Sequence, residues 1–488
     1  MKFVRESTGL VKEFGTFDVF ALNFSFLGPA AGIAYPLFIS AFLPNSNWIL
    51  AVIISSLLML PLTINYYILS TNIPRSAGDY IYVSRALGPR IGIMVGMSLI
   101  TAFSMGFPVL AMLEVIMVII PALQLIGYYL NNNSIISLAN VIMNSNVYLF
   151  ALTTVFIIVS FLLSFKGKVY AKSVSYLTIL QLIGGIISLI GLFMMKGKSI
   201  TDITVPQLNG QTFALASVFA LSLFAFSNAP SFFAGEVKRK RNIFFIGYIL
   251  SYAIATLFTL LFVLAIEYGI GKDEYITYTL QGWNLPIYTG STLSFLALPF
   301  LKSPLLFLVI ASGLTWYLLY AMINVSASSR LLFSMSFDRV LPAFLSEVRN
   351  GIPVNALLLT LLSSMLFNFI EVYLGLSVSF AIDGLWFITW NYLVVSIASL
   401  KLANLDRRLL ITAPLSILGL STVIISTIFY VLTYSTFGNI ILQGNVPFDI
   451  FTVILPPLIG LITYEVSRIE RKKEGIELEL IYKEIQPE

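Results

Sequence analysis

Two short runs, Gly28-Pro29-Ala30-Ala31-Gly32 and Ser227-Asn228-Ala229-Pro230-Ser231, interrupt long apolar segments near their middles. Proline removes a backbone donor and clashes with the preceding helical turn, and glycine tolerates non-helical dihedral angles. Each run therefore predicts a break in a helix. Proline also kinks helices that only pack together. A pair of breaks at corresponding positions in two halves of a membrane chain instead points to a ligand site.

The composition places these breaks in a membrane protein. The chain has 488 residues, of which 58% are hydrophobic and 10% are charged, whereas a soluble domain is about a quarter charged. Many apolar runs reach the roughly 20 residues that cross a bilayer as a helix. Strands of a membrane barrel would be about ten residues long and alternating. We therefore expect an all-α membrane protein with twelve transmembrane helices, at residues 16–43, 48–70, 91–125, 147–165, 173–195, 212–236, 243–268, 304–333, 354–374, 377–402, 412–434 and 448–466.

The positions of the two breaks predict how these helices are organised. They fall in the first and sixth expected spans, as two inverted repeats of five helices require. We expect a first repeat and a second repeat, followed by two additional helices and flanked by short tails. The expected boundaries are 1–15 for the N-terminal tail, 16–196 and 212–402 for the repeats, 412–466 for the last two helices and 467–488 for the C-terminal tail.

The distribution of basic residues predicts the orientation. All but four of the 28 Lys and Arg residues fall in segments on one side of the expected topology, the exceptions being Lys196, Lys198, Lys272 and Lys302. Cytoplasmic loops are the ones enriched in Lys and Arg. We therefore expect a multi-pass protein of the cell membrane with both termini in the cytoplasm. The net charge of +5 then reflects orientation in membrane lipid, and no nucleic-acid partner is expected.

Two residue types are missing from the sequence, and this narrows the chemistry. There is no cysteine and no histidine, which removes thiolate metal sites and the commonest proton-shuttling side chain. A phosphate-binding Walker A loop is also missing. No cofactor and no metal site are expected, and the sequence makes no prediction of the oligomeric state.

The chemistry of the breaks suits a small zwitterion. Amides freed after the first break form the positive end of a half-helix and can bind a carboxylate. Carbonyls freed at residues 26–28 and 226–228 can accept hydrogen bonds from an ammonium group. The predicted ligand-binding residues are Gly28, Ala30, Ala31, Gly32, Ile33, Phe226, Ser227, Asn228 and Ala229, together with Asn324 from the eighth span.

Carboxylates within membrane spans are costly and point to function. Glu114 and Asp383 lie in the outer halves of the third and tenth spans. Because no histidine is available, they are the candidate proton carriers or cation attractors; the alternative is an ordinary hydrated carboxylate in a wet vestibule. Glu236, at the end of the sixth span, is a candidate inner-gate residue or a structural ion-pair partner.

Aromatic and polar residues on the tenth span are candidates for gating the same cavity. They are Trp386, Trp390, Asn391 and Tyr392. Aromatic residues at such positions also serve simply to pack helices together, so packing is the alternative interpretation.

Three segments resemble the amino acid–polyamine–organocation (APC) family. Residues 73–92 (IPRSAGDYIYVSRALGPRIG) are similar to the loop between the second and third helices of that family. Residues 224–242 (FAFSNAPSFFAGEVKRKRN) resemble its sixth helix, and residues 329–357 (SRLLFSMSFDRVLPAFLSEVRNGIPVNAL) resemble the loop between its eighth and ninth helices. All three segments fall where the expected topology places them, and together they span the ten-helix core.

The resemblance implies an amino acid permease with a broken-helix transporter fold and two extra C-terminal helices. It implies amino acids or related amines as substrates, with proton coupling or exchange. Ala31, Gly32 and Ile33 match the end of the Gly-Ser-Gly-Ile turn that binds carboxylates in the family, with Ala30 and Ala31 in place of its first glycine and serine. Many members carry a glycine and an acid where Asn228 and Pro230 stand here, so mechanisms that use that acid do not transfer.

Other functions remain open at this point. A polyamine or organic-cation transporter would use Glu114 and Asp383 to hold extra positive charge. In related sodium-coupled transporters, hydroxyl groups on the eighth helix bind sodium, which makes Ser326, Ser328 and Ser329 candidate ligands, although serine is also common in helix packing. A membrane enzyme is the remote alternative, because no cluster of acids or active-site serine with partners is evident.

Overall fold

The computed structural model describes residues 9–195, 208–238, 241–349, 351–434 and 446–483. Lys196 and Lys198, which contributed to the expected orientation, lie outside these residues. The described chain is almost entirely helical, and its isolated β-bridges join Phe14 to Val237 and Arg349 to Ile352.

The first half of the chain contains long apolar helices and several short ones. In chain order they are α1 (Thr16–Leu27), α2 (Ala34–Ser40), α3 (Trp48–Asn72), α4 (Gly78–Leu87), α5 (Pro89–Glu114), the π-helical turn η1 (Val115–Ile119), α6 (Ile120–Tyr129), α7 (Asn133–Met143), α8 (Asn146–Ser164) and α9 (Gly167–Met194).

The second half begins with another interrupted helix. Its elements are α10 (Gly210–Phe219), η3 (Ala220–Phe224), α11 (Ala229–Phe232), η4 (Ala234–Glu236), α12 (Arg241–Phe245), η5 (Ile246–Leu250), α13 (Ser251–Gly269), α14 (Lys272–Gln281), α15 (Thr292–Ala297), η6 (Leu298–Phe300), α16 (Leu305–Gly313), α17 (Trp316–Phe337), η7 (Ala343–Ser346), α18 (Val354–Leu374), α19 (Ser377–Lys401), α20 (Leu409–Thr433), α22 (Val446–Lys473) and α23 (Leu478–Ile481).

Eleven helices in the described residues are long and apolar enough to cross a membrane. The twelfth expected span, at residues 16–43, is split between α1 and α2, and each piece is too short to be counted by length. The difference between the twelve expected spans and the eleven long helices therefore comes from the break in the first span. The all-α membrane fold expected from the sequence is confirmed, and the protein is a multi-pass membrane protein.

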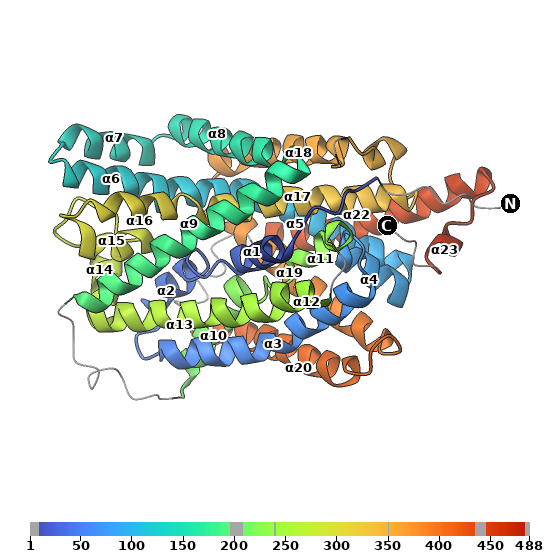
Figure 1. The fold of residues 1–488 in the computed structure, drawn as a ribbon, viewed down its shortest axis with the longest axis horizontal. Helices are drawn as coiled ribbons and strands as arrows, with labels where there is room; N and C mark the ends of the chain where they lie inside the picture. Colours follow the sequence, from blue (N-terminus) through green and yellow to red (C-terminus); the bar gives the residue numbers. More distant parts are fainter. Residues whose placement is uncertain (1–8, 196–207, 239–240, 350, 435–445, 484–488) are drawn as a thin grey trace.

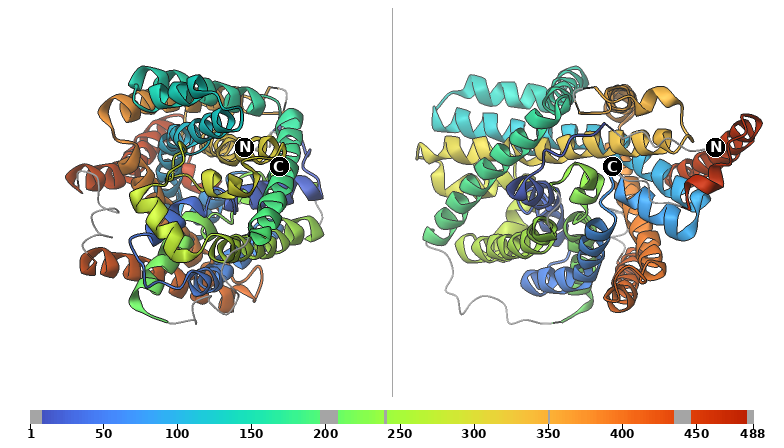
Figure 2. Two further views of the ribbon diagram at one scale, coloured as in Figure 1. Left: turned by 90° about the vertical axis from the view of Figure 1, so that its left-hand side faces the viewer. Right: turned by 45° about the vertical axis from the view of Figure 1, so that its right-hand side comes forward.

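The broken helices lie in the interior of the bundle (Figure 1). α1, α2 and α11 occupy its middle, between a group that includes α6, α8 and α18 and a group that includes α3, α13 and α20. α22 and α23 project beyond the bundle at the end that also holds α4, whereas α14 lies at the opposite end (Figures 1 and 2). The interior position explains why α10 and its continuation are mostly buried while α20 and α22 are mostly exposed.

Side-chain caps lie at the beginnings of α3 and α10. The Asn47 side chain accepts from the Leu50 amide at the start of α3, and the Asn209 side chain accepts from the Thr212 amide at the start of α10. Such caps satisfy amides that have no partner within the helix. The two ends are also joined, because the Asn47 amide donates to the Thr212 hydroxyl at 2.9 Å. Helices from the two halves of the chain are therefore held together at this end of the molecule.

Candidate functional site

The first break separates α1 from α2 at residues 28–33. Gly28 takes the left-handed conformation, with φ of 53°, and ends α1. The Tyr320 hydroxyl of α17 donates to the carbonyl of Leu27 at 2.9 Å. A carbonyl released by the break is thus satisfied by a side chain from another helix, as a buried backbone group requires.

The sequence predicted free amides after this break, and two of the amides there are hydrogen-bonded within the chain. The Gly32 amide donates to the carbonyl of Gly28 at 2.6 Å, so in this conformation it is used within the turn. The Ala34 amide likewise donates to Ala31 at 3.1 Å. Ala30, Ala31 and Ile33 are buried at the break. Local turn formation, which hydropathy cannot reveal, accounts for the engaged Gly32 amide.

The second break lies between η3 and α11. Helical pairing widens into a π-helical turn at Ala220–Phe224 and stops, and α11 begins at Ala229. Asn228 precedes α11, and its side chain joins two other elements. Its amide nitrogen donates to Asp79 Oδ2 of α4 at 3.0 Å, and its oxygen accepts from the Tyr392 hydroxyl of α19 at 2.8 Å.

The two breaks lie against each other. The rings of Phe26 and Phe226 meet edge to face, with centroids 5.2 Å apart. Tyr320 packs on both rings, at 5.8 Å and 6.1 Å. A Cβ atom on Gly32 would come within 3.1 Å of the Leu223 side chain in η3. The fold therefore brings together the two runs that the sequence marked as breaks.

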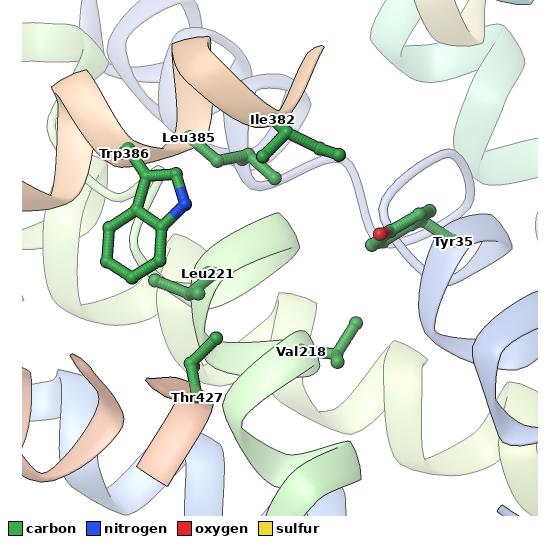
Figure 3. A pocket seen from close by; sticks show the side chains of 7 residues that line it. All are labelled: Tyr35, Val218, Leu221, Ile382, Leu385, Trp386 and Thr427. Atoms are coloured by element: carbon green, nitrogen blue, oxygen red, sulfur yellow. The ribbon is translucent and has the colours of Figure 1, made fainter. Parts of the chain in front are cut away.

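An apolar pocket lies beside α2, which follows the first break, and beside the helix that precedes the second break (Figure 3). It is lined by Tyr35 of α2, Val218 and Leu221 of the helix before the second break, Ile382, Leu385 and Trp386 of α19, and Thr427 of α20. In the close-up, Trp386 and Leu385 face Leu221 across the pocket. Trp386 therefore lines the pocket, and its gating role stays a prediction. Trp390, four residues further along α19, is 56% exposed and does not line the pocket.

The opposite end of the broken helices is closed by an ion pair. Arg330 of α17 donates to both carboxylate oxygens of Glu236, each at 3.0 Å, and both side chains are buried. The Phe14 amide donates to the Glu236 carbonyl, and the Lys238 amide donates to the Phe14 carbonyl. Chain preceding α1 is thereby hydrogen-bonded to chain following α11, and the inner-gate role of Glu236 stays a prediction.

Residues on the eighth span fall on different sides of α17. Asn324 is buried, and its amide nitrogen lies beside Gly106 of α5, where a Cβ would be 3.4 Å away. The Ser328 hydroxyl accepts from Thr360 of α18 at 3.2 Å. The Ser329 hydroxyl donates to the Ser326 carbonyl and accepts from Arg330. Ser328 and Ser329 are therefore both hydrogen-bonded within the protein.

The two acids singled out from the sequence lie on α5 and α19. Glu114 is buried where α5 meets η1, about 12 Å along the helix from Gly106 at 1.5 Å per residue. Asp383 is buried against α22, where it accepts from the Thr452 hydroxyl at 2.5 Å. Asn391 is also buried, in the same helix as Asp383.

The sequence reasoning missed three residues that join the site: Tyr320, Arg330 and Asp79. Asp79 lies between two expected spans, so a search for acids within the spans passed over it. It is fully buried. Burial raises the pKa of Asp79 to about 7, while the nearby Tyr66 hydroxyl and the hydrogen bond from Asn228 act in the opposite direction. The run Ser76-Ala77-Gly78-Asp79, within a segment already matched to a family loop, was the available signal.

Two comparisons with known proteins show what this chain is similar to. The family model for amino acid permeases matches residues 14–462. Protein 399 of Sulfolobus islandicus rod-shaped virus 1 is 29% identical over 466 residues, which cover 95% of this chain and 97% of that protein. The family match begins just before α1 and extends into α22, so it includes both broken helices and the pocket between them. The chain therefore belongs to the amino acid permease family.

Proposed function

We propose that this protein is a secondary active transporter that moves amino acids across the membrane by alternating access. The observation that carries the proposal is the contact between the two breaks, at Phe26, Phe226 and Gly32. Irregular backbone deep in a membrane is tolerated where it lines a cavity or is buried in protein. A pair of such breaks offers carbonyls and half-helix ends to a substrate carrying both an ammonium and a carboxylate. Family membership supports a transporter rather than an enzyme.

Hydrophobic rings at the break favour a substrate with a compact, uncharged side chain. Phe26, Phe226 and Tyr320 surround the backbone groups expected to hold the zwitterion. Apolar pockets discriminate among side chains by size and by the burial of polar groups. We infer that substrate binding displaces Tyr320 from the Leu27 carbonyl, which then becomes available to the substrate ammonium.

Opposite ends of the broken helices provide the two gates of the proposed cycle. The Glu236–Arg330 pair and the backbone hydrogen bonds of Phe14 close one end. The apolar pocket around Trp386 and Tyr35 lies at the other end (Figure 3). Rocking of one helix group against the other would open these ends in turn. We propose that the Glu236 end faces the cytoplasm, together with both termini, and that transport is coupled to protons or proceeds by exchange.

Uptake into proteoliposomes tests the proposal. The purified protein would be assayed with a panel of labelled amino acids and with labelled putrescine, under imposed pH and sodium gradients. We expect uptake of at least one neutral amino acid, competed by other amino acids. Uptake of putrescine in preference to every amino acid would favour an organic-cation transporter, and uptake of neither would contradict the function.

A glycine substitution tests the assigned site. Gly32→Leu should abolish uptake while folded protein remains in the membrane, because even a Cβ there would meet Gly28 O at 3.0 Å and Leu223 at 3.1 Å. Gly384→Leu is the matched control, since a Cβ at Gly384 would meet no atom within 4 Å. Normal transport by Gly32→Leu would contradict the placement of the substrate.

A further inference from the structure

Asp79 differs from the other buried acids in what it contacts. Glu236 is paired with Arg330, Asp338 is paired with Arg85, and Asp383 accepts from Thr452. Asp79 instead accepts a hydrogen bond from Asn228, a residue of the second helix break. An acid in this position can sense the state of the substrate site directly.

The surroundings of Asp79 supply hydrogen bonds but no positive charge. The titratable groups facing it are the hydroxyls of Tyr66 on α3, Tyr248 on η5 and Tyr392 on α19. On its own helix, Tyr82 bonds to Ser70 and Arg85 is committed to Asp338. Among the described residues that act on the Asp79 carboxyl there is no lysine or arginine. A carboxyl buried among neutral groups is poised to take up and release a proton at neutral pH.

The helix that carries Asp79 is also fastened to the helix after the break. The Ala77 amide donates to the Phe232 carbonyl of α11 at 3.1 Å. Gly78 lies so close to Ser231 that a Cβ would be 2.7 Å from the serine side chain. α4 lies beside α11 in the ribbon view (Figure 1). Any movement of α11 that opens this end of the site therefore moves or exposes Asp79.

We propose that Asp79 is the proton-binding site of this transporter and that Asn228 couples its protonation to substrate binding. The inference rests on the proposed transport function and extends it to the coupling ion. When Asp79 carries the proton, it stays buried and α4 remains packed on α11. When an O–H bond of the carboxylic acid breaks and the proton passes to water, the buried carboxylate that remains is costly. Ionisation therefore favours the conformation in which α11 swings away and water reaches Asp79.

The Tyr392–Asn228–Asp79 chain gives the physical link between the two ligands. Asn228 is fixed from one side by Tyr392 and from the other by Asp79. Substrate held by the carbonyls of residues 226–228 would contact the segment that contains Asn228. Protonation of Asp79 would change the hydrogen bond to that same residue. Coupling between two ligands requires one structural element whose conformational equilibrium is shifted by each ligand. The segment around Asn228 is this element for the substrate and the proton.

The test compares proton-driven accumulation with exchange in proteoliposomes. The probe is the labelled amino acid that the wild type takes up fastest in the panel, with acid outside and with or without a protonophore. For the wild type we expect the pH gradient to raise accumulation about tenfold, within the usual range of coupling between sites. Asp79→Asn should lose this stimulation. Exchange of internal for external amino acid should remain measurable, with a rate that no longer depends on pH.

A second acid variant and a control separate coupling from folding. Asp79→Glu keeps a carboxyl and should retain gradient-driven accumulation, with a shifted pH midpoint. Glu371→Gln is the matched control, because Glu371 is a buried acid on α18 that the proposal does not use; its pH profile should follow that of the wild type. Monodisperse elution and thermal unfolding would confirm that each variant is folded.

Three results would overturn the proposal. The first is gradient-driven accumulation by Asp79→Asn at the wild-type level. The second is wild-type uptake that ignores both pH and the pH gradient, which would leave amino acid transport standing without Asp79 as its proton site. The third is loss of pH dependence in Asp383→Asn or Glu114→Gln while Asp79→Asn retains it. Failure of the wild type to move any amino acid would instead contradict the transport function itself.

Discussion

The ring of Tyr320 lies directly over Gly28, in the space that any larger residue at position 28 would need. A Cβ atom on Gly28 would come within 2.2 Å of the Tyr320 ring, and Gly28 also has a φ of 53°. The break in the first membrane span therefore depends on a residue of α17, far away in the sequence.

Gly28→Ala should destabilise the protein and abolish transport. The substitution forces Tyr320 away from the Leu27 carbonyl and strains a left-handed residue, which costs about 1–2 kcal/mol for the backbone alone. Gly375→Ala is the matched control, because Gly375 has a φ of 68° and meets no atom within 4 Å. Thermal unfolding and uptake would be measured for both. Equal effects of the two variants would show that the contact with Tyr320 is unimportant.

Arg330→Met should lower the unfolding free energy by about 3–5 kcal/mol, because it leaves the buried Glu236 carboxylate without its partner. The double variant Glu236→Gln/Arg330→Met should recover much of this loss, since no charge is then buried alone. The control is Glu347→Gln, which removes an exposed ion pair with Arg349. This variant should lower the unfolding free energy by about 1 kcal/mol or less. Unfolding by SDS in mixed micelles would give the values. Additive losses in the double variant would contradict a direct pair.

Asp79→Asn should become more stable relative to the wild type as the pH rises from about 4 to about 7. Burial raises the pKa of Asp79 from 3.8 to about 7. The wild type therefore has its full stability below pH 3.8 and loses it progressively as the pH rises towards 7, whereas the asparagine does not titrate. The gain in unfolding free energy of Asp79→Asn relative to the wild type should be on the order of a few kcal/mol and should level off above pH 7. Thermal midpoints at a series of pH values would show it, and parallel curves would contradict it.

Leu478→Ala should release the short C-terminal helix α23 from the body of the protein. Leu478 is 1% exposed, and the nearby Tyr482 hydroxyl is hydrogen-bonded to Tyr80 of α4 at 2.9 Å. Truncation of a buried leucine costs about 2–5 kcal/mol. We expect this loss to exceed the free energy that holds so short a helix against the protein. Leu480→Ala in the same helix is the control, because Leu480 is 51% exposed. Limited trypsin cleavage near Lys473 should speed up only for Leu478→Ala, and equal rates would contradict the docking.

Local chemistry was sufficient to predict the membrane spans and both breaks. Apolar runs of about 20 residues predict helices, because a helix pairs its own backbone within a bilayer and barrel strands would be shorter and alternating. Proline with glycine predicts where this pairing stops. Helix ends were predicted less well. α22 continues to Lys473 although hydropathy ends the span at Val466, because Arg471, Lys472 and Lys473 suit the C-terminal end of a helix.

Only the tertiary structure decided which groups meet at the breaks. Tyr320 covers Gly28, Arg330 binds Glu236, and Asp79 bonds to Asn228. Each of these partners is separated from the other by a long stretch of chain. Hydropathy and residue spacing carry no record of such contacts, because packing of distant helices creates them. The sequence by itself therefore determined where the backbone is interrupted, and the folded bundle determined which side chains contact the interruptions.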